Sequence, residues 1–414
     1  MLATVYPTTS HHSVDLYAES QTADPFQALY NSIAKLSLTE QQQTTTAKTQ
    51  DEQQQEEDLL TITPLFPPGE NVIFAHSTFF RRPALPGNIY PDLPTPAQVR
   101  AEAGLMMMAT DDDNSNSTHQ TVMTTVFPSH ELLVKHGMGV RAAEGKAMIL
   151  AWKTLVDADA ADAGKSGILS DGRPPVPEVF GWRKDPATGE RCVYMEMPRG
   201  DVLEERWAGM TDLEREVVCA QLKGLVREWR RLRLGVGFVG SVDHGPLQDE
   251  VFRNCVAAGA PPPGPFPTVA AFHDYFVTMA ATLSHRRHYG GSHHHMGVVY
   301  QPSYSAPAPP PHLFPADVPI VFTHGALHPR NIIVTQGPNP RVVAIMGWEN
   351  AGWAPAYWEL CKARWECSRR GRLGGGWETK YLPWILDAEG LGKHLREWSV
   401  GALCQYWDYF VGLL

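Results

Sequence analysis

The chain has 414 residues, which is long enough to bury a large core and to form more than one compact unit. Its formal net charge of −10 and isoelectric point near 5.9 provide no basic field, which argues against a nucleic-acid partner. No uninterrupted apolar run approaches the ~20 residues that cross a bilayer, and the opening residues lack the basic and apolar segments of a secretory signal. These features predict a cytoplasmic protein that contacts neither nucleic acid nor membrane.

The first 58 residues are polar and low in complexity, with repeated glutamine and threonine. Such a composition buries too little apolar surface to offset the entropy of ordering, so residues 1–58 are predicted to be a disordered tail. Within the tail, residues 15–38 carry an amphipathic pattern formed by Phe26, Leu29, Ile33 and Leu36. Both a docked helix and disorder fit this segment.

Residues 59–197 are predicted to form a proline-rich extension followed by a small, mostly β unit. A helix is expected to begin at Pro94-Thr95-Pro96. A longer helix is expected over 142–156, where the apolar stripe contains Met148, Ala151, Trp152 and Leu155. Runs rich in β-branched and aromatic residues predict strands over 121–127, 131–135, 176–182 and 191–197.

Residues 198–414 are predicted to form a larger, mainly helical unit. Thr211 and Glu214 have the spacing of a capping box, and the helix that they open is expected to bury Leu213, Val217, Leu222, Leu225, Trp229 and Leu232. A second helix is expected over 268–284, followed by an irregular insertion over 286–316 that contains a histidine run. Helices rich in tryptophan then close the chain from 355 to 414, and those tryptophans are interpreted as core residues.

The six cysteines are spread along the chain without the close pairing of a zinc site. Free, buried thiols in a reducing compartment are therefore predicted for Cys192, Cys219, Cys255, Cys361, Cys367 and Cys404.

A β-hairpin is predicted near the start of the last third of the chain. Apolar runs at 318–322, 331–334 and 341–346 read as strands, and the last two are joined by the turn-forming residues 336–340. In an antiparallel hairpin, the loop that enters the first strand and the loop that leaves the second lie at the same end. Residues 324–331 and 347–350 are therefore expected to face each other across one site.

These two loops resemble those of the aminoglycoside phosphotransferase and choline-kinase-like family, especially its fungal branch. The family's catalytic loop runs His-Gly-Asp-Leu-His-Pro-x-Asn, and residues 324–331 read His-Gly-Ala-Leu-His-Pro-Arg-Asn. The family's metal loop runs Ile-Ile-Asp-Trp-Glu, and residues 345–349 read Ile-Met-Gly-Trp-Glu. Ala326 stands where the resemblance implies the catalytic base, and Gly347 where it implies the main magnesium ligand.

The resemblance extends over about residues 93–404 and implies a two-lobed α+β protein-kinase-like fold with ATP and magnesium as cofactors. It implies an ion pair between Lys135 and Glu144 at the nucleotide phosphates, and adenine binding by the backbone near Glu196 and Met197. Asn331 would be a residual metal ligand. The loss of both aspartates weakens the case for ATP and for magnesium, so neither is assigned.

Three side chains remain beside the vacant aspartate positions: His324, His328 and Glu349. One interpretation gives them acid–base chemistry on an organic ligand without ATP, with His324 as the leading candidate. The alternative gives each of them a structural role.

Three functions therefore compete. The first is a pseudokinase that binds a small-molecule ligand or a protein partner without turnover. The second is a repurposed enzyme that acts on a small natural product in the old kinase cleft, and the third is a residual ATP-dependent small-molecule kinase. The sequence does not define the oligomeric state.

Overall fold

The computed structural model describes residues 3–5, 66–81, 92–109, 122–161, 173–232, 237–253, 256, 259–289, 314–370, 373–393 and 399–413. The chain divides into two compact units. The first unit comprises residues 1–153, 174–199 and 234–236, and the second comprises residues 154–173, 200–233 and 237–414. Most of the predicted tail, including its amphipathic segment, and the histidine run at 293–295 lie outside the described residues, as does Cys255.

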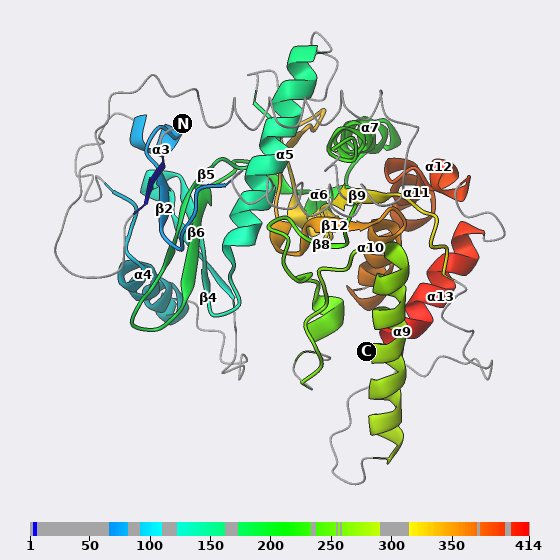
Figure 1. The fold of residues 1–414 in the computed structure, drawn as a ribbon. Coiled ribbons are helices and arrows are strands. Elements are labelled where there is room, and N and C mark those ends of the chain that lie inside the picture. The colour runs from blue at the N-terminus through cyan, green and yellow to red at the C-terminus, as the bar shows by residue number, and fades with distance from the viewer. Residues whose placement is uncertain are drawn as a thin grey trace. The chain divides into compact units, whose positions relative to one another are not determined.

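The first unit is built on an antiparallel sheet (Figure 1). From one edge to the other, its strands are β1 (Ala3–Val5), β2 (Val72–Phe74), β5 (Val179–Lys184), β6 (Arg191–Glu196), β4 (Leu132–Gly137) and β3 (Met123–Phe127). Strand β1 lies within the segment that we predicted to be disordered, and its backbone pairs with β2. The four predicted strands of this unit are all present, with ends that differ by a few residues.

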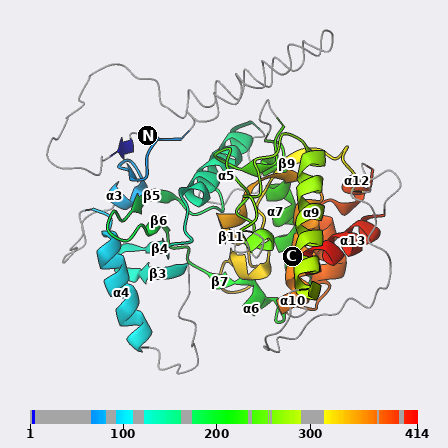
Figure 2. The same ribbon diagram turned by 60° about the horizontal axis from the view of Figure 1, so that its bottom comes forward.

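The remaining elements of the first unit are short helices and one long helix. They are α3 (Thr78–Arg81), α4 (Pro96–Ala109), the 3₁₀ turn η2 (Pro128–His130) and α5 (Ala142–Ala161). Helix α4 lies along β3 and β4 (Figure 2). Helix α5 approaches β5 and β6 closely at Gly145, where an added Cβ would lie 3.3 Å from the Trp182 ring. Met148, Ala151 and Leu155 of the predicted stripe are buried.

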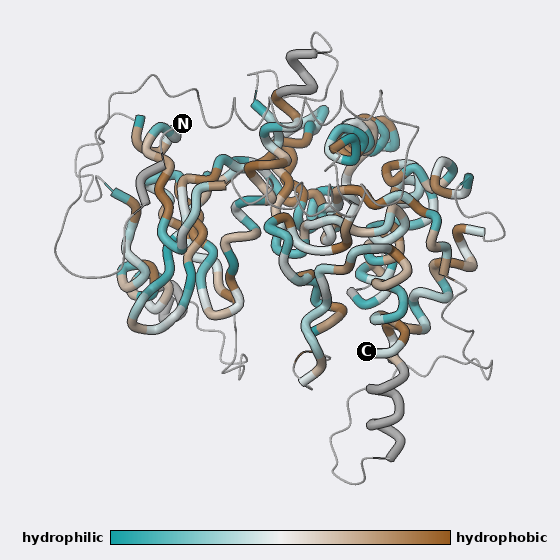
Figure 3. Tube along the Cα trace, viewed as in Figure 1, coloured by the Kyte–Doolittle hydropathy of each residue, from teal (hydrophilic) through white to brown (hydrophobic). Residues whose placement is uncertain are grey.

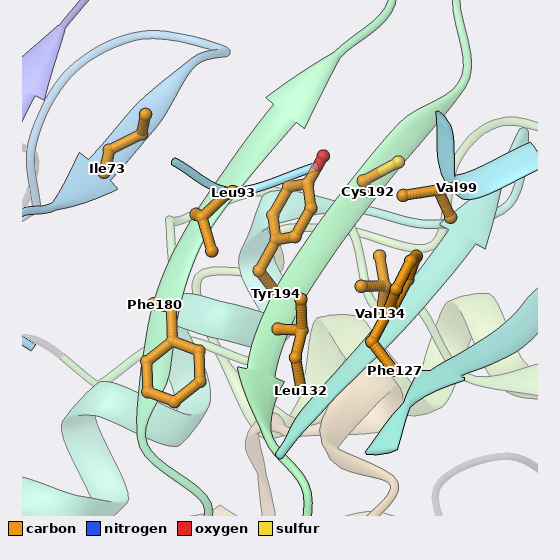
Figure 4. Close-up of a cluster of buried hydrophobic side chains, with 9 residues drawn as sticks. All are labelled: Ile73, Leu93, Val99, Phe127, Leu132, Val134, Phe180, Cys192 and Tyr194. Atoms are coloured by element: carbon orange, nitrogen blue, oxygen red, sulfur yellow. The ribbon is translucent and has the colours of Figure 1, made fainter. Parts of the chain in front are cut away.

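The core of the first unit lies on the α4 side of the sheet (Figure 4). Val99 of α4 joins a cluster with aromatic and aliphatic side chains from five strands. The buried cluster comprises Ile73, Leu93, Val99, Phe127, Leu132, Val134, Phe180, Cys192 and Tyr194. Each large apolar side chain contributes about 1.5–3 kcal/mol when it is removed from water. The Tyr194 hydroxyl donates a hydrogen bond to the Pro94 carbonyl at 2.7 Å, which satisfies its one polar group.

The second unit is mainly helical, with two small antiparallel sheets. One sheet has the order β11 (Val342–Ile345), β10 (Ile332–Val334), β7 (Asp201–Val202), and the other has the order β8 (Gly240–Ser241), β12 (Gly352–Pro355), β9 (Ile320–Thr323). The longer helices are α7 (Asp212–Trp229), α9 (Val269–Tyr289), α10 (Trp358–Arg370) and α13 (Val400–Leu413). Short elements complete the unit: α6 (Leu203–Trp207), η3 (Glu250–Phe252), η5 (Pro329–Asn331), η6 (Trp348–Asn350), η7 (Trp377–Tyr381), α11 (Leu382–Ile385) and α12 (Ala388–Gly392).

Helix α7 begins with the predicted capping box, in which Thr211 and Glu214 each bond the other's backbone N–H. The predicted buried face was wrong at its start, because Leu213 and Val217 are exposed by 69% and 39%. The buried stripe instead runs through Val218, Leu222, Leu225 and Trp229. A one-residue change rotates a helix by about 100°, so Val218 rather than Val217 continues the stripe that Leu222 and Leu225 define.

The aromatic core of the second unit joins helices that are far apart in the sequence. The rings of Trp358 and Trp407 lie 5.2 Å apart, and Phe276 of α9 packs against both. This arrangement confirms the interpretation as core residues for Trp358 and Trp407, and Trp377 is also buried. For Trp384 the interpretation was wrong, because its side chain is 41% exposed. Helix α9 continues to Tyr289, so residues 286–289 of the predicted irregular insertion are helical, and residues 290–313 lie outside the described residues. Apolar stretches follow strands of the first unit (Figure 3).

The predicted α+β fold class is confirmed: a β-rich unit with one long helix is followed by a larger, mainly helical unit. Among the helices within the described ranges, none combines the length and the apolar character that a membrane crossing requires.

Candidate functional site

The predicted hairpin forms as expected from the sequence. Strands β10 and β11 pair in antiparallel register, with Ile332 opposite Ile345. The backbone N–H of Met346 donates to the Asn331 carbonyl at 2.7 Å, immediately beyond the paired residues. The loop over 324–331 and the loop over 347–350 therefore meet at one end of the hairpin.

The side chain of Asn331 occupies the junction between these loops. Its Nδ2 donates to the Ala326 carbonyl at 2.8 Å. The same side chain lies against Gly347, because a Cβ added there would be 2.8 Å from Asn331 Nδ2 and 3.0 Å from its Cγ. Gly347 has a φ of +79°, a backbone conformation that glycine adopts without strain. The two positions that lack aspartates are thus linked through one amide.

His324 is held by the backbone on both sides of its ring. Its Nε2 lies 2.8 Å from the Met346 carbonyl, and its Nδ1 accepts the Ala326 N–H at 3.2 Å. This pattern places the proton on Nε2 and defines a neutral imidazole. The ring is fully buried and packs against the indole of Trp348 with 4.5 Å between centroids. The geometry therefore favours the structural alternative for His324 over an acid–base role.

His328 and Glu349 lie in different environments. His328 is buried, and its Nδ1 accepts the Arg330 N–H at 3.3 Å and lies 3.8 Å from a carboxylate oxygen of Glu204. Glu349 is exposed on η6. The hairpin brings the three candidate acid–base residues to the same end of the unit, but it does not place their side chains in one common environment.

A buried carboxylate supports the backbone of the loop over 324–331. Glu359, at the start of α10, accepts the N–H of Gly325 at 2.9 Å and the N–H of His324 at 3.3 Å. Burial raises the pKa of Glu359, and the guanidinium of Arg230 and the two backbone donors oppose that rise. Gly325 itself has a φ of +76° and lies against the Asn350 backbone, so a side chain there is excluded.

A buried ion pair supports the η6 loop. Lys362 Nζ lies 2.8 Å from Asp249 Oδ1, and both side chains are almost fully buried. Asp249 also accepts the indole N–H of Trp358 at 3.0 Å, and in its better-satisfied orientation the Asn350 amide accepts from Lys362 at 3.2 Å. Sequence analysis missed both Asp249 and Lys362. The available sequence signal was Lys362 itself, a charged residue within a predicted helix whose tryptophans are interpreted as core residues.

In the first unit, the predicted pair of Lys135 and Glu144 is formed. Lys135 Nζ and Glu144 Oε1 are 2.9 Å apart, and the side chains are exposed by only 15% and 4%. Lys135 lies in the run of strand β4 that pairs with β6, and Glu144 lies in the first turn of α5. Whether this pair binds phosphate stays a prediction.

The backbone donors expected to bind adenine are already engaged within the first unit. The N–H of Glu196 donates to the Glu178 carbonyl at 2.9 Å, and the N–H of Met197 donates to the Glu131 carbonyl at 2.9 Å. The next residue, Pro198, has no N–H. The N–H groups of Glu196 and Met197 are therefore engaged within the first unit, and adenine binding by this stretch stays a prediction.

The donor set of the hairpin does not fit Mg²⁺, the metal that the family resemblance implies. Mg²⁺ takes near-octahedral oxygen ligands, usually carboxylates together with substrate phosphates. At the two expected ligand positions, the chain offers the single amide oxygen of Asn331, and Gly347, which has no side chain. No cluster of three or more histidine, cysteine or acidic side chains suited to a metal occurs within the described ranges.

The segment that carries the hairpin matches a known protein family. Residues 304–388, which contain the hairpin and both loops, match the model of the Phosphotransferase enzyme family. The resemblance drawn from the two loops is thus confirmed over the segment that carries them.

Solved structures of similar fold include several aminoglycoside phosphotransferases. The aminoglycoside phosphotransferase APH(3'')-Id from Streptomyces rimosus is 13% identical, with 76% of this chain and 98% of that chain covered and a TM-score of 0.36. A putative aminoglycoside phosphotransferase from Ralstonia eutropha is 14% identical, with 71% and 77% covered and a TM-score of 0.34. The GDP complex of wild-type aminoglycoside 2'-phosphotransferase-IIIa is 11% identical, with 75% and 97% covered and a TM-score of 0.32. The comparison with curated proteins gives no match.

Proposed function

We propose that this protein is a pseudokinase of the phosphotransferase family, which binds a small-molecule ligand or a protein partner and transfers no phosphate. The observation that carries the proposal is the pair of loops in which Ala326 and Gly347 replace the expected aspartates while Asn331 still joins them. A positioned acid or base contributes roughly 10²–10⁴-fold to a rate, and loss of the metal ligand compounds that deficit.

The engaged backbone around Glu196 and Met197 is a second, independent support. With the N–H groups of Glu196 and Met197 engaged, a purine would lack these two hydrogen-bond donors. The Lys135–Glu144 pair nevertheless persists, and a lysine held in this way suits an anionic group. An anionic ligand without a purine requirement therefore fits the chain better than ATP does.

The two alternative functions have weaker support. A repurposed enzyme requires an acid–base group, and both nitrogens of the leading candidate, His324, contact the backbone. A residual kinase requires a metal site that the loops do not supply from their own side chains. The pseudokinase proposal requires neither feature.

The test compares nucleotide binding with phosphate transfer on the full chain. Thermal unfolding is recorded with ATP alone and with ATP plus Mg²⁺, because a ligand that binds only the native state raises the midpoint. We expect no Mg²⁺-dependent shift and no phosphate transfer from ATP to water or to a panel of aminoglycosides and amino alcohols. ATP hydrolysis that requires Mg²⁺ and disappears in Lys135→Met would overturn the proposal.

The matched gain-of-function variant restores both aspartates, as Ala326→Asp with Gly347→Asp. We expect this double variant to gain a Mg²⁺-dependent thermal shift only if Asn331 moves aside, because the Cβ introduced at position 347 would meet its amide. The single Ala326→Asp variant leaves the metal position unchanged and should behave as the wild type.

A further inference from the structure

Two buried cysteines from separate parts of the chain face each other in the second unit. Cys361 lies in the first turns of α10 and Cys404 lies in α13, and their sulfur atoms are 3.6 Å apart. Both side chains are about 1% exposed. The sulfur of Cys361 is placed to donate to the sulfur of Cys404. This contact places two thiols within van der Waals distance of each other.

The surroundings of the two sulfurs are not equivalent. The hydrogen bond from Cys361 and the nearby guanidinium of Arg364 lower the pKa of Cys404 against the opposing effects of burial and of Asp408. Burial raises the pKa of Cys361 well above its ordinary value. Thiolates are the reactive form of cysteine, so Cys404 is the better nucleophile toward a peroxide, and Cys361 is the neighbouring thiol that can react with the oxidised Cys404.

We propose that Cys361 and Cys404 are a reversible oxidation site, at which a hydroperoxide converts the thiol pair to a disulfide that joins α10 to α13. The sulfur of Cys404 attacks the peroxide oxygen, the O–O bond breaks, and hydrogen peroxide leaves as water while Cys404 becomes a sulfenic acid. The sulfur of Cys361 then attacks the Cys404 sulfur, the S–O bond breaks, and a second water leaves with the Cys361 proton. The two sulfurs together lose two electrons and the peroxide gains two.

The geometry requires only a local adjustment. The sulfurs must approach from 3.6 Å to the ~2.05 Å of a disulfide, a movement of about 1.5 Å. The consequence reaches the candidate site, because Cys361 follows Glu359 by two residues, and Glu359 binds the backbone of the catalytic-type loop. Oxidation would link α10, the helix that carries Glu359, covalently to α13. The inference does not depend on the proposed function.

The experiment maps disulfides in the full-length wild-type chain. The reduced, folded protein is treated with hydrogen peroxide, its remaining thiols are alkylated under denaturing conditions, and non-reducing peptide mass spectrometry follows. We expect one linked peptide pair containing Cys361 and Cys404, with the mass of two hydrogens lost and regained on treatment with dithiothreitol. The oxidised protein should unfold at a midpoint higher by roughly 5 °C, because the cross-link restricts the unfolded chain.

Two variants provide the controls. Cys404→Ser should abolish the linked pair, whereas Cys367→Ser, a change of another buried cysteine on the same helix as Cys361, should leave it unchanged. The proposal fails if both thiols of the wild type remain fully alkylated after peroxide treatment. It also fails if the two cysteines reach only sulfinic or sulfonic acids, or if the linked pair forms only in urea. The wild-type mapping decides the question even if a variant does not fold.

Discussion

A single residue outside the loop over 324–331 explains why this loop keeps its backbone conformation without the expected aspartates. Glu359 accepts two consecutive N–H groups from His324 and Gly325, and its carboxylate is fully buried. The loop over 324–331 is therefore held by α10 independently of any ligand. Ala326 and Gly347 carry no carboxylate, and the support from Glu359 does not depend on either side chain.

Glu359→Gln should destabilise the protein by about 2 kcal/mol, because an amide has one acceptor oxygen and turns an N–H group towards a backbone donor. Urea unfolding followed by tryptophan fluorescence measures the change. The matched control is Glu216→Gln, which breaks the exposed pair with Lys380 and should cost less than about 1 kcal/mol. Equal costs for the two variants would show that Glu359 does not support the loop.

Asp408 makes stability depend on pH. Burial raises the pKa of Asp408 from 3.8 to about 6, so the native state holds this proton more tightly than the unfolded chain does. Stability contributed by the protonated group is complete below pH 3.8 and is lost as pH rises through about 6.

Asp408→Asn should therefore stabilise the protein at pH 7, by about 1 kcal/mol after allowance for solvent screening, and should give no gain near pH 3.5. Urea unfolding of both proteins at the two pH values measures the difference. Asp212→Asn, at an exposed position on α7, serves as the control. A gain that is the same at both pH values would contradict the assignment.

At the scale of structural elements, the tight approach of the two loops limits what Gly347 can be replaced by. Gly347→Ala should cost about 2 kcal/mol, because an L-residue is strained at a φ of +79° and its Cβ would contact the Asn331 amide. Thermal and urea unfolding measure the loss.

The hairpin turn provides the control for this variant. Gly337 also has a φ of +79°, but no atom lies within 4 Å of an added Cβ. Gly337→Ala should therefore show only the backbone cost of about 1 kcal/mol. If the two variants lose the same stability, the contact between Asn331 and position 347 does not contribute to the free energy of unfolding.

At the scale of the whole molecule, the second unit depends on an aromatic core that joins the middle and the end of the chain. Trp407→Ala should cost about 3–5 kcal/mol, since it removes contacts to Phe276, Trp358 and Trp365 at once. Trp384→Ala should cost about 1 kcal/mol, because this indole is 41% exposed and its recorded contact is a cation–π pair with Lys223. Urea unfolding of the two variants checks the contrast.

The sequence by itself determined the fold class, the position of the hairpin and the identity of its two loops. These features depend on local signals: alternation in strands, turn residues at 336–340, the capping box of Thr211 and Glu214, and the loop motifs. It also determined that Ala326 and Gly347 carry no carboxylate. Local patterns suffice for such features because each is encoded within a few consecutive residues.

Only the tertiary structure decided which groups are engaged. The tautomer of His324 depends on the carbonyl of Met346, and the occupied N–H groups of Glu196 and Met197 depend on residues that are distant in the sequence. The contact between Cys361 and Cys404 joins two residues that are 43 positions apart. Hydrogen bonds and sulfur contacts of this kind are set by packing over a few ångströms, and spacing along a chain does not specify distances between segments that meet only on folding.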